Sequence, residues 1–231
     1  MTYTLRELDT DLWVAEAPLK TLGLQIGTRM TVVRLANHEL WIHSPIQISG
    51  ALKESIDALG LVQYIVAPNA FHHLYLADAS AAWPEAQVWG AQALKKKRKD
   101  VRFDGLFREG DELPWSDEIE DCYLAGAILD ETVFFHRKSR TLISSDLAVN
   151  QMQADDWLTK LYLKASRVEG KFGHSLLIKV CFRDKAKSRA SIDRLMEWNF
   201  DRVILAHGEV LESGGREAVE RSFKWLPATK K

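Results

Sequence analysis

Short runs of hydrophobic residues, separated by polar turns, occupy the first part of the chain. Residues 12–16, 30–35 and 40–43 are rich in Val, Ile, Leu and Trp, and the turn Asn37-His38-Glu39 separates the last two runs. Runs of this length and composition predict β-strands, and the short polar turn predicts a hairpin. The chain is therefore expected to open with antiparallel sheet.

Helical periodicity follows and then alternates with further strands. Leu52, Ile56 and Leu59 form one apolar face of a predicted helix that begins near Ser49 and stops at Gly60. Further strands are predicted at 64–67, 87–89, 120–124, 132–135, 141–144 and 203–206. Further helices are predicted from Leu74 toward Ala82, after residue 89 with an end in the basic run 95–99, and at 155–166, 185–198 and 214–225.

No composition shift or Pro/Ser-rich spacer divides the 231 residues, so a single domain over 1–231 is predicted.

The 31 basic and 32 acidic side chains give a net charge of −1, which argues against nucleic-acid and membrane partners. Only two cysteines occur, far apart, and the N-terminus has no apolar signal-like segment. These features predict a cytoplasmic protein.

Common catalytic signatures are absent from the sequence. It has no G-x-x-x-x-G-K-[ST] phosphate loop, no G-x-G-x-x-G, no G-x-S-x-G and no H-E-x-x-H. The basic run 95–99 is interpreted as a solvated helix end, and 170–173 as a turn without phosphate-loop spacing.

Candidate chemistry lies where buried strands end. His72 and His73, then Asp146, then His207 each follow an apolar run, so neighbouring strands would bring them to one edge. Imidazole nitrogen and carboxylate oxygen suit Zn²⁺ or Fe²⁺, and an open coordination position lowers the pKa of bound water toward ~7. The alternative is that these residues only form hydrogen bonds and caps in loops. His43 is interpreted as a buried, paired histidine, and His136 and His174 are given no role.

At these residues the chain resembles the metallo-β-lactamase-like superfamily, over nearly its whole length. The resemblance implies an α+β fold, an αββα sandwich of two mixed β-sheets packed face to face with helices outside. It is closest to an uncharacterised branch of unknown function. The segment Trp41-Ile42-His43-Ser44-Pro45 replaces the Asp-Thr-Gly-like turn of active members, and this branch supplies no activity to transfer.

The family hallmark, H-x-H-x-D-H, is degenerate in this chain. With its last residue on His73, Pro68 and Ala70 replace the first two histidines and His72 replaces the aspartate. In an alternative register, Asn69 and Phe71 take the first two positions and His73 takes the aspartate position. The next family histidine falls at Ala127. Asp146 matches the bridging aspartate, within an L-F-T-G-D-L-like segment, and His207 in Leu205-Ala206-His207-Gly208 matches the terminal histidine.

The resemblance therefore implies that the first metal site is lost and the second is kept. One divalent ion, zinc or iron, would be held by His73, Asp146 and His207, with His72 as a further ligand and Asp146 as the catalytic residue. The implied function is hydrolysis of a small ester, thioester, lactone or phosphoester by a bound hydroxide. The alternative is a non-catalytic relative that binds a metabolite or a protein partner at the former active-site edge, for which a bound metal is not required.

Overall fold

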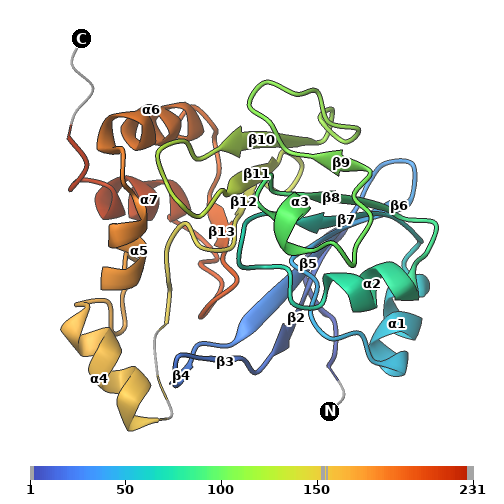
Figure 1. Ribbon diagram of the computed structural model, residues 1–231, viewed down its shortest axis with the longest axis horizontal. Coiled ribbons are helices and arrows are strands. Elements are labelled where there is room, and N and C mark those ends of the chain that lie inside the picture. Colours follow the sequence, from blue (N-terminus) through green and yellow to red (C-terminus); the bar gives the residue numbers. More distant parts are fainter. Residues whose placement is uncertain (1–2, 152–153, 155, 228–231) are drawn as a thin grey trace.

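Two β-sheets form the centre of the molecule, and helices lie on their outer faces (Figure 1). The computed structural model describes residues 3–151, 154 and 156–227. The larger sheet contains, in spatial order, β1 (Arg6–Asp9), β2 (Leu12–Ala17), β5 (Thr28–Arg34), β6 (Glu39–His43), β7 (Leu61–Ala67), β8 (Gln87–Gly90) and β9 (Gly105–Leu106). The second contains β10 (Ile119–Tyr123), β11 (Thr132–His136), β12 (Thr141–Ile143) and β13 (Arg202–Ile204).

Each sheet combines antiparallel and parallel pairs. In the larger sheet the pairs from β1 to β6 are antiparallel and those from β6 to β9 are parallel. In the second sheet only β13 runs parallel to its neighbour. A separate hairpin joins β3 (Lys20–Thr21) to β4 (Leu24–Gln25). The prediction of two mixed sheets is therefore confirmed.

The helices divide between the two outer faces. In Figure 1, α1 (Gly50–Asp57) and α2 (Leu76–Ala82) lie on the larger sheet's side, and α6 (Lys185–Leu195) and α7 (Gly215–Ser222) lie on the opposite side. The others are α3 (Leu94–Lys97), α4 (Trp157–Ala165) and α5 (Leu176–Cys181). Asp155, where a helix was predicted to start, lies outside the described residues, and α4 begins after the cap Asp156.

Alternation along the strands builds three apolar layers. In β11, Val133 and Phe135 pack with the α6 and α7 side, whereas Phe134 between them points into the core shared by both sheets. In β6, Trp41 joins that shared core and Ile42 packs with the α1 and α2 side. Because successive strand residues face opposite ways, each central strand supplies two layers. These layers are the three interfaces of an αββα sandwich.

The parallel pair β12 and β13 fixes one edge of the second sheet. Ile143 lies opposite Ile204 in this pair. Asp146 and His207 each come three residues after those partners, so both strands deliver a polar side chain to the same edge. The end of β7 meets this edge from the larger sheet, because the amide of Thr132 donates to the carbonyl of Pro68 over 3.0 Å.

Candidate metal centre

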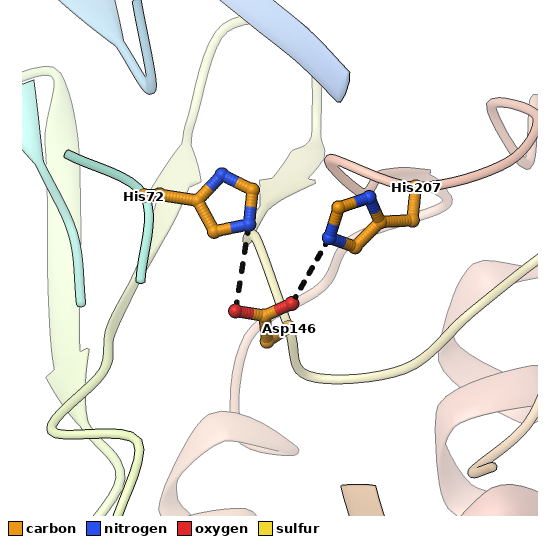
Figure 2. A group of neighbouring side chains, drawn as sticks. All are labelled: His72, Asp146 and His207. Atoms are coloured by element: carbon orange, nitrogen blue, oxygen red, sulfur yellow. Dashed lines mark ion pairs between the residues drawn. The ribbon is translucent and has the colours of Figure 1, made fainter. Parts of the chain in front are cut away.

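Three side chains from three strand ends converge at this edge of the sandwich. His72 follows β7, Asp146 follows β12 and His207 follows β13. Figure 2 shows both imidazole rings pointing toward the carboxylate between them. The Nε2 atom of His72 lies 3.4 Å from Oδ2 of Asp146, and Nε2 of His207 lies 3.3 Å from Oδ1. One potential ligand atom from each residue lies within 4.8 Å of the others.

The three side chains are close to solvent but largely covered. Their exposed fractions are 7% for His72, 14% for Asp146 and 9% for His207. A site with this little exposure weakens competition from bulk water. The arrangement has the ligand types and spacing of a three-residue divalent metal site.

A backbone carbonyl fixes the orientation and tautomer of His207. The ring Nδ1 lies 2.8 Å from the carbonyl oxygen of Gly27, the residue immediately before β5. Because a carbonyl only accepts, Nδ1 carries a proton and donates it. Arg29, whose side chain is 4% exposed, donates to the carbonyls of Leu205 and Gly208 on either side of His207. Gly27, just before β5, and Arg29, in β5, therefore hold the ring of His207 in place.

Asn69 shapes the turn that carries His72. Its Oδ1 accepts from the amides of Phe71 and His72, each over 2.8 Å, and its Nδ2 donates to Oδ2 of Asp146 over 2.7 Å. This Asx-type turn directs the ring of His72 toward Asp146. Asn69 is fully buried, so one side chain ties the turn after β7 to the turn after β12.

Below the site, a buried glutamate holds the turn that carries Asp146. Glu131 has no exposed surface, and its carboxylate accepts from the hydroxyl of Ser144 and the amide of Ser145 over 2.6 and 2.7 Å. The amide of Asp146 donates to the same carboxylate. Sequence reasoning missed Glu131, because an acidic residue before an apolar strand has no pattern that distinguishes it from an exposed one.

The pKa values of the ionisable groups in and below the cluster depend on one another. Burial raises the pKa of Asp146, but the adjacent His72 and His207 rings outweigh burial and hold this pKa well below its usual range. Burial lowers the pKa of His207, but the hydrogen bond and charge of Asp146 outweigh it and leave the pKa raised. Burial, followed by the charge of Asp146, raises the pKa of Glu131 to about 7.

His73 does not belong to the cluster, which corrects the hypothesis that made it a ligand. Its Nδ1 lies 3.2 Å from Nη1 of Arg98, and the same guanidinium donates to the carbonyl of His73. Burial, with the charges of Lys97 and Arg98, lowers the pKa of His73 to about 4. The Asn69 turn points consecutive side chains in different directions, so only His72 faces Asp146.

The residues at the other motif positions offer no metal ligand. Pro68, Ala70 and Ala127 carry no side-chain donor atom. His43 is buried and stacks on Trp41, with ring centroids 5.5 Å apart. Burial, together with the charge of His72, lowers the pKa of His43 to about 3. Within the described residues, His72, Asp146 and His207 form the one group with metal-site spacing.

Comparisons with known proteins agree with this fold. The sequence model described as Domain of unknown function (DUF4336) matches residues 9–171. No curated protein matches the sequence. A metallo-β-lactamase from Hirschia baltica is similar in structure with a TM-score of 0.66, at 10% identity and with 100% of both chains covered.

Two further structures extend the comparison. A metallo-β-lactamase from Pontibacter korlensis aligns with a TM-score of 0.66 and 11% identity, over 97% of this chain and 99% of that one. The metal-soaked Flv1 flavodiiron core from Synechocystis sp. PCC6803 aligns with a TM-score of 0.68 and 14% identity, over 97% of this chain and 60% of that one. At these identities the likeness shows the fold, which is the metallo-β-lactamase fold.

Proposed function

Because this chain belongs to the family described as Domain of unknown function (DUF4336), we propose its function from the chemistry of its own site. The proposal is a mononuclear, metal-dependent hydrolase whose divalent ion is held by His72, Asp146 and His207. The observation that carries it is the convergence of two imidazole Nε2 atoms and one carboxylate within 4.8 Å.

The donor set fits a metal ion. When the ring of His207 is neutral, its proton stays on Nδ1, which donates to the carbonyl of Gly27. The lone pair of Nε2 is then directed at the lone pairs of Asp146, 3.3 Å away. Two lone pairs at this distance need a proton or a cation between them. Metal-ligating histidines also characteristically donate their second ring nitrogen to a carbonyl, as His207 does. Zinc and ferrous iron both accept two imidazoles and a carboxylate.

The residues in and around the site have distinct roles in this proposal. Asp146 supplies the negative charge, and Asn69 donates to it and limits its rotation. Gly27 and Arg29 keep His207 in a single orientation. A bound ion would supply Lewis acidity and a lowered pKa for water in the position left open by three protein ligands.

Hydrolysis of a small ester, thioester, lactone or phosphoester is the proposed reaction class. Support comes from the fold shared with proteins named metallo-β-lactamases and from the absence of donor atoms at Pro68, Ala70 and Ala127, which favours one ion. Phe71 and Leu74, whose exposed fractions are 52% and 57%, flank His72 and His73 in sequence and offer apolar contacts to a substrate near the site.

Metal content is the first test. The protein is purified without chelator or a histidine tag, and elemental analysis is combined with titration of zinc and ferrous iron into the metal-free protein. We expect about one ion per chain in the parent, and a loss of roughly 100-fold or more in affinity for His207→Ala and Asp146→Ala, because each removes one of three ligands.

His73→Ala is the matched control, because His73 is adjacent to His72 in sequence but pairs with Arg98. It should bind metal as the parent does, whereas His72→Ala should not. Equal losses for His72→Ala and His73→Ala, or metal content that none of the variants changes, would contradict the proposed site.

Turnover is tested separately with a panel of ester, thioester, lactone and phosphodiester substrates. The metal-loaded parent should hydrolyse at least one class, and Asp146→Ala should lose that activity. Equal rates in both would indicate a contaminant. Metal binding without turnover would favour the second candidate, a relative that binds a metabolite or partner at this edge.

A further inference from the structure

Helices α4 and α5 each expose an apolar stripe to solvent. The two helices carry six of the eleven large hydrophobic side chains that are exposed among the described residues. In each helix the three exposed residues stand at positions i, i+1 and i+4, on the side opposite the buried residues: Trp157, Leu158 and Leu161 in α4, and Leu176, Leu177 and Val180 in α5. The core needs neither stripe, since other residues of both helices fill it.

The segment that carries these stripes is rich in basic residues. Between 156 and 183 the chain has six basic side chains, all exposed, against two acidic ones, Asp156 and Glu169. The six are Lys160, Lys164, Arg167, Lys171, Lys179 and Arg183. Within the part of the chain that the structure describes, none of the six forms an ion pair. Their charge is therefore available to an anionic partner.

Three of these cations line one hollow. Arg167, Lys171 and Lys179 lie around a depression of about 480 Å³ between the end of α4 and the start of α5. Leu176, whose side chain is 53% exposed, lies on its border. A phosphate-bearing head group would find both charge neutralisation and an adjacent apolar surface there.

We propose that this α4–α5 surface, made of the six apolar and six basic side chains named above, docks on an anionic lipid bilayer. Amphipathic helices with Trp and Leu on one face and Lys or Arg beside them lie in the bilayer interface, with the apolar face among the acyl chains. Basic side chains then extend to the phosphates, and Trp is favoured at the depth of the head groups.

The position of the surface permits such docking. In Figure 1, α4 and α5 lie at one side of the molecule, and α4 extends beyond the two sheets. The β3–β4 hairpin packs against α4, where the amide of Gln25 donates to Oγ1 of Thr159 over 2.8 Å. Leu22 at the tip of this hairpin, 82% exposed, adds a further apolar side chain. Among the described residues no helix is long and apolar enough to span a membrane, so the docking is peripheral.

Charge distinguishes a bilayer from a second copy of the chain. A symmetric dimer through this surface would place the same patch on both sides and bring its six cations together, which is repulsive. The near-neutral net charge predicted no membrane partner, but net charge averages over the whole chain. Local excess, not the total, determines attraction to an anionic surface.

Vesicle flotation tests the proposal with the full chain. Vesicles of phosphatidylcholine alone are compared with vesicles containing about one third phosphatidylserine, over a series of salt concentrations. We expect the protein to bind the anionic vesicles at least about tenfold better, with binding that weakens as salt rises. Lys164→Glu with Lys171→Glu should reduce this binding by about tenfold or more, and Leu161→Ser should also reduce it.

Matched controls come from elsewhere on the surface. Lys95→Glu with Lys96→Glu makes the same charge change on α3, and Leu61→Ser replaces a comparably exposed leucine, 65% against 56% for Leu161. Both should bind vesicles as the parent does. Circular dichroism and metal content should be unchanged in every variant, since none lies in the metal centre, so this test is independent of the proposed function.

Three results would overturn the proposal. The first is a parent protein that does not float with anionic vesicles at low salt. The second is a loss of binding as large in the control variants as in the α4–α5 variants. The third is a concentration-dependent dimer, seen by sedimentation, that Leu161→Ser converts to monomer, because the occupant would then be a second copy.

Discussion

The pKa of a buried histidine in this molecule depends on whether a carboxylate lies beside the ring. His207 is buried beside Asp146 and its pKa is raised. His136 has no exposed surface, its Nδ1 lies 2.7 Å from Oγ of Ser139, and burial, with the charge of Lys138, lowers its pKa to about 4. Desolvation penalises the charged ring in both cases, so the neighbouring group determines the outcome.

A pH-dependent loss of stability follows from the burial of His136. An ordinary histidine has a pKa of 6.5, so between about pH 6.5 and 4 the unfolded chain takes up a proton that the folded chain does not. The free energy of unfolding must therefore fall as the pH falls through this range. His136→Gln should make the fall shallower, by on the order of 1–2 kcal/mol between pH 7 and 5.

Urea denaturation of the parent and His136→Gln at several pH values measures this effect. The comparison uses the difference between pH 7 and pH 5 within each protein, so a constant change in stability from the substitution cancels. If the two proteins lose equal stability on acidification, His136 is not the group responsible.

At the scale of elements, two helices with similar serine caps differ in whether the sequence predicted them. Ser49, which was predicted as the start of a helix, accepts from the amide of Leu52 at the start of α1. Ser175 caps α5 in the same way, but no helix was predicted there. With six residues, α5 is too short for a periodic pattern, and three of its apolar residues face solvent while Ile178 is buried, so periodicity carried no signal.

The candidate metal site was also predictable only in part. Asp146 and His207 could be paired from the sequence because both follow buried strands, and the parallel register of β12 and β13 places them at one edge. The choice between His72 and His73 could not be made. It depends on the hydrogen bonds of Asn69 to two amides of the turn, which apolar periodicity does not reveal.

The turn after β13 depends on Gly208. Its φ of +81° is in the left-handed region, and an added Cβ would lie 2.5 Å from the backbone C and O of Asn150. Gly208→Ala should therefore lower the free energy of unfolding by about 2 kcal/mol or more, because backbone strain and a clash add together. It should also weaken metal binding, since His207 is the preceding residue.

Gly214→Ala is the matched control for Gly208→Ala. Gly214 has a φ of +68°, but an added Cβ would have no atom within 4 Å. Only the backbone term, about 1 kcal/mol, is expected there. Urea denaturation and metal titration of both variants give the comparison, and equal effects at the two glycines would show that the contact with Asn150 is unimportant.

At the scale of the whole molecule, the candidate metal centre spans two sheets that are joined by one aromatic core. His72 comes from the larger sheet, whereas Asp146 and His207 come from the second. Phe134 of the second sheet lies 5.1 Å from Trp41 and 5.6 Å from Phe107, measured between ring centroids. The distance between the ligands therefore depends on how closely the sheets pack.

Comparing two adjacent phenylalanines tests this dependence. Phe134 fills the core between the sheets, and Phe135 stacks on Trp198 on the outer face of the second sheet, 5.5 Å away. Phe134→Ala and Phe135→Ala should each lower the free energy of unfolding by about 3–5 kcal/mol. The two variants should differ in metal affinity, because only Phe134→Ala alters the packing between the two sheets that carry the ligands. Isothermal titration with zinc, under conditions where both variants remain folded, should show weaker binding by Phe134→Ala than by Phe135→Ala. If both bind zinc as tightly as the parent, the ligands are positioned by their own turns rather than by the packing of the sheets.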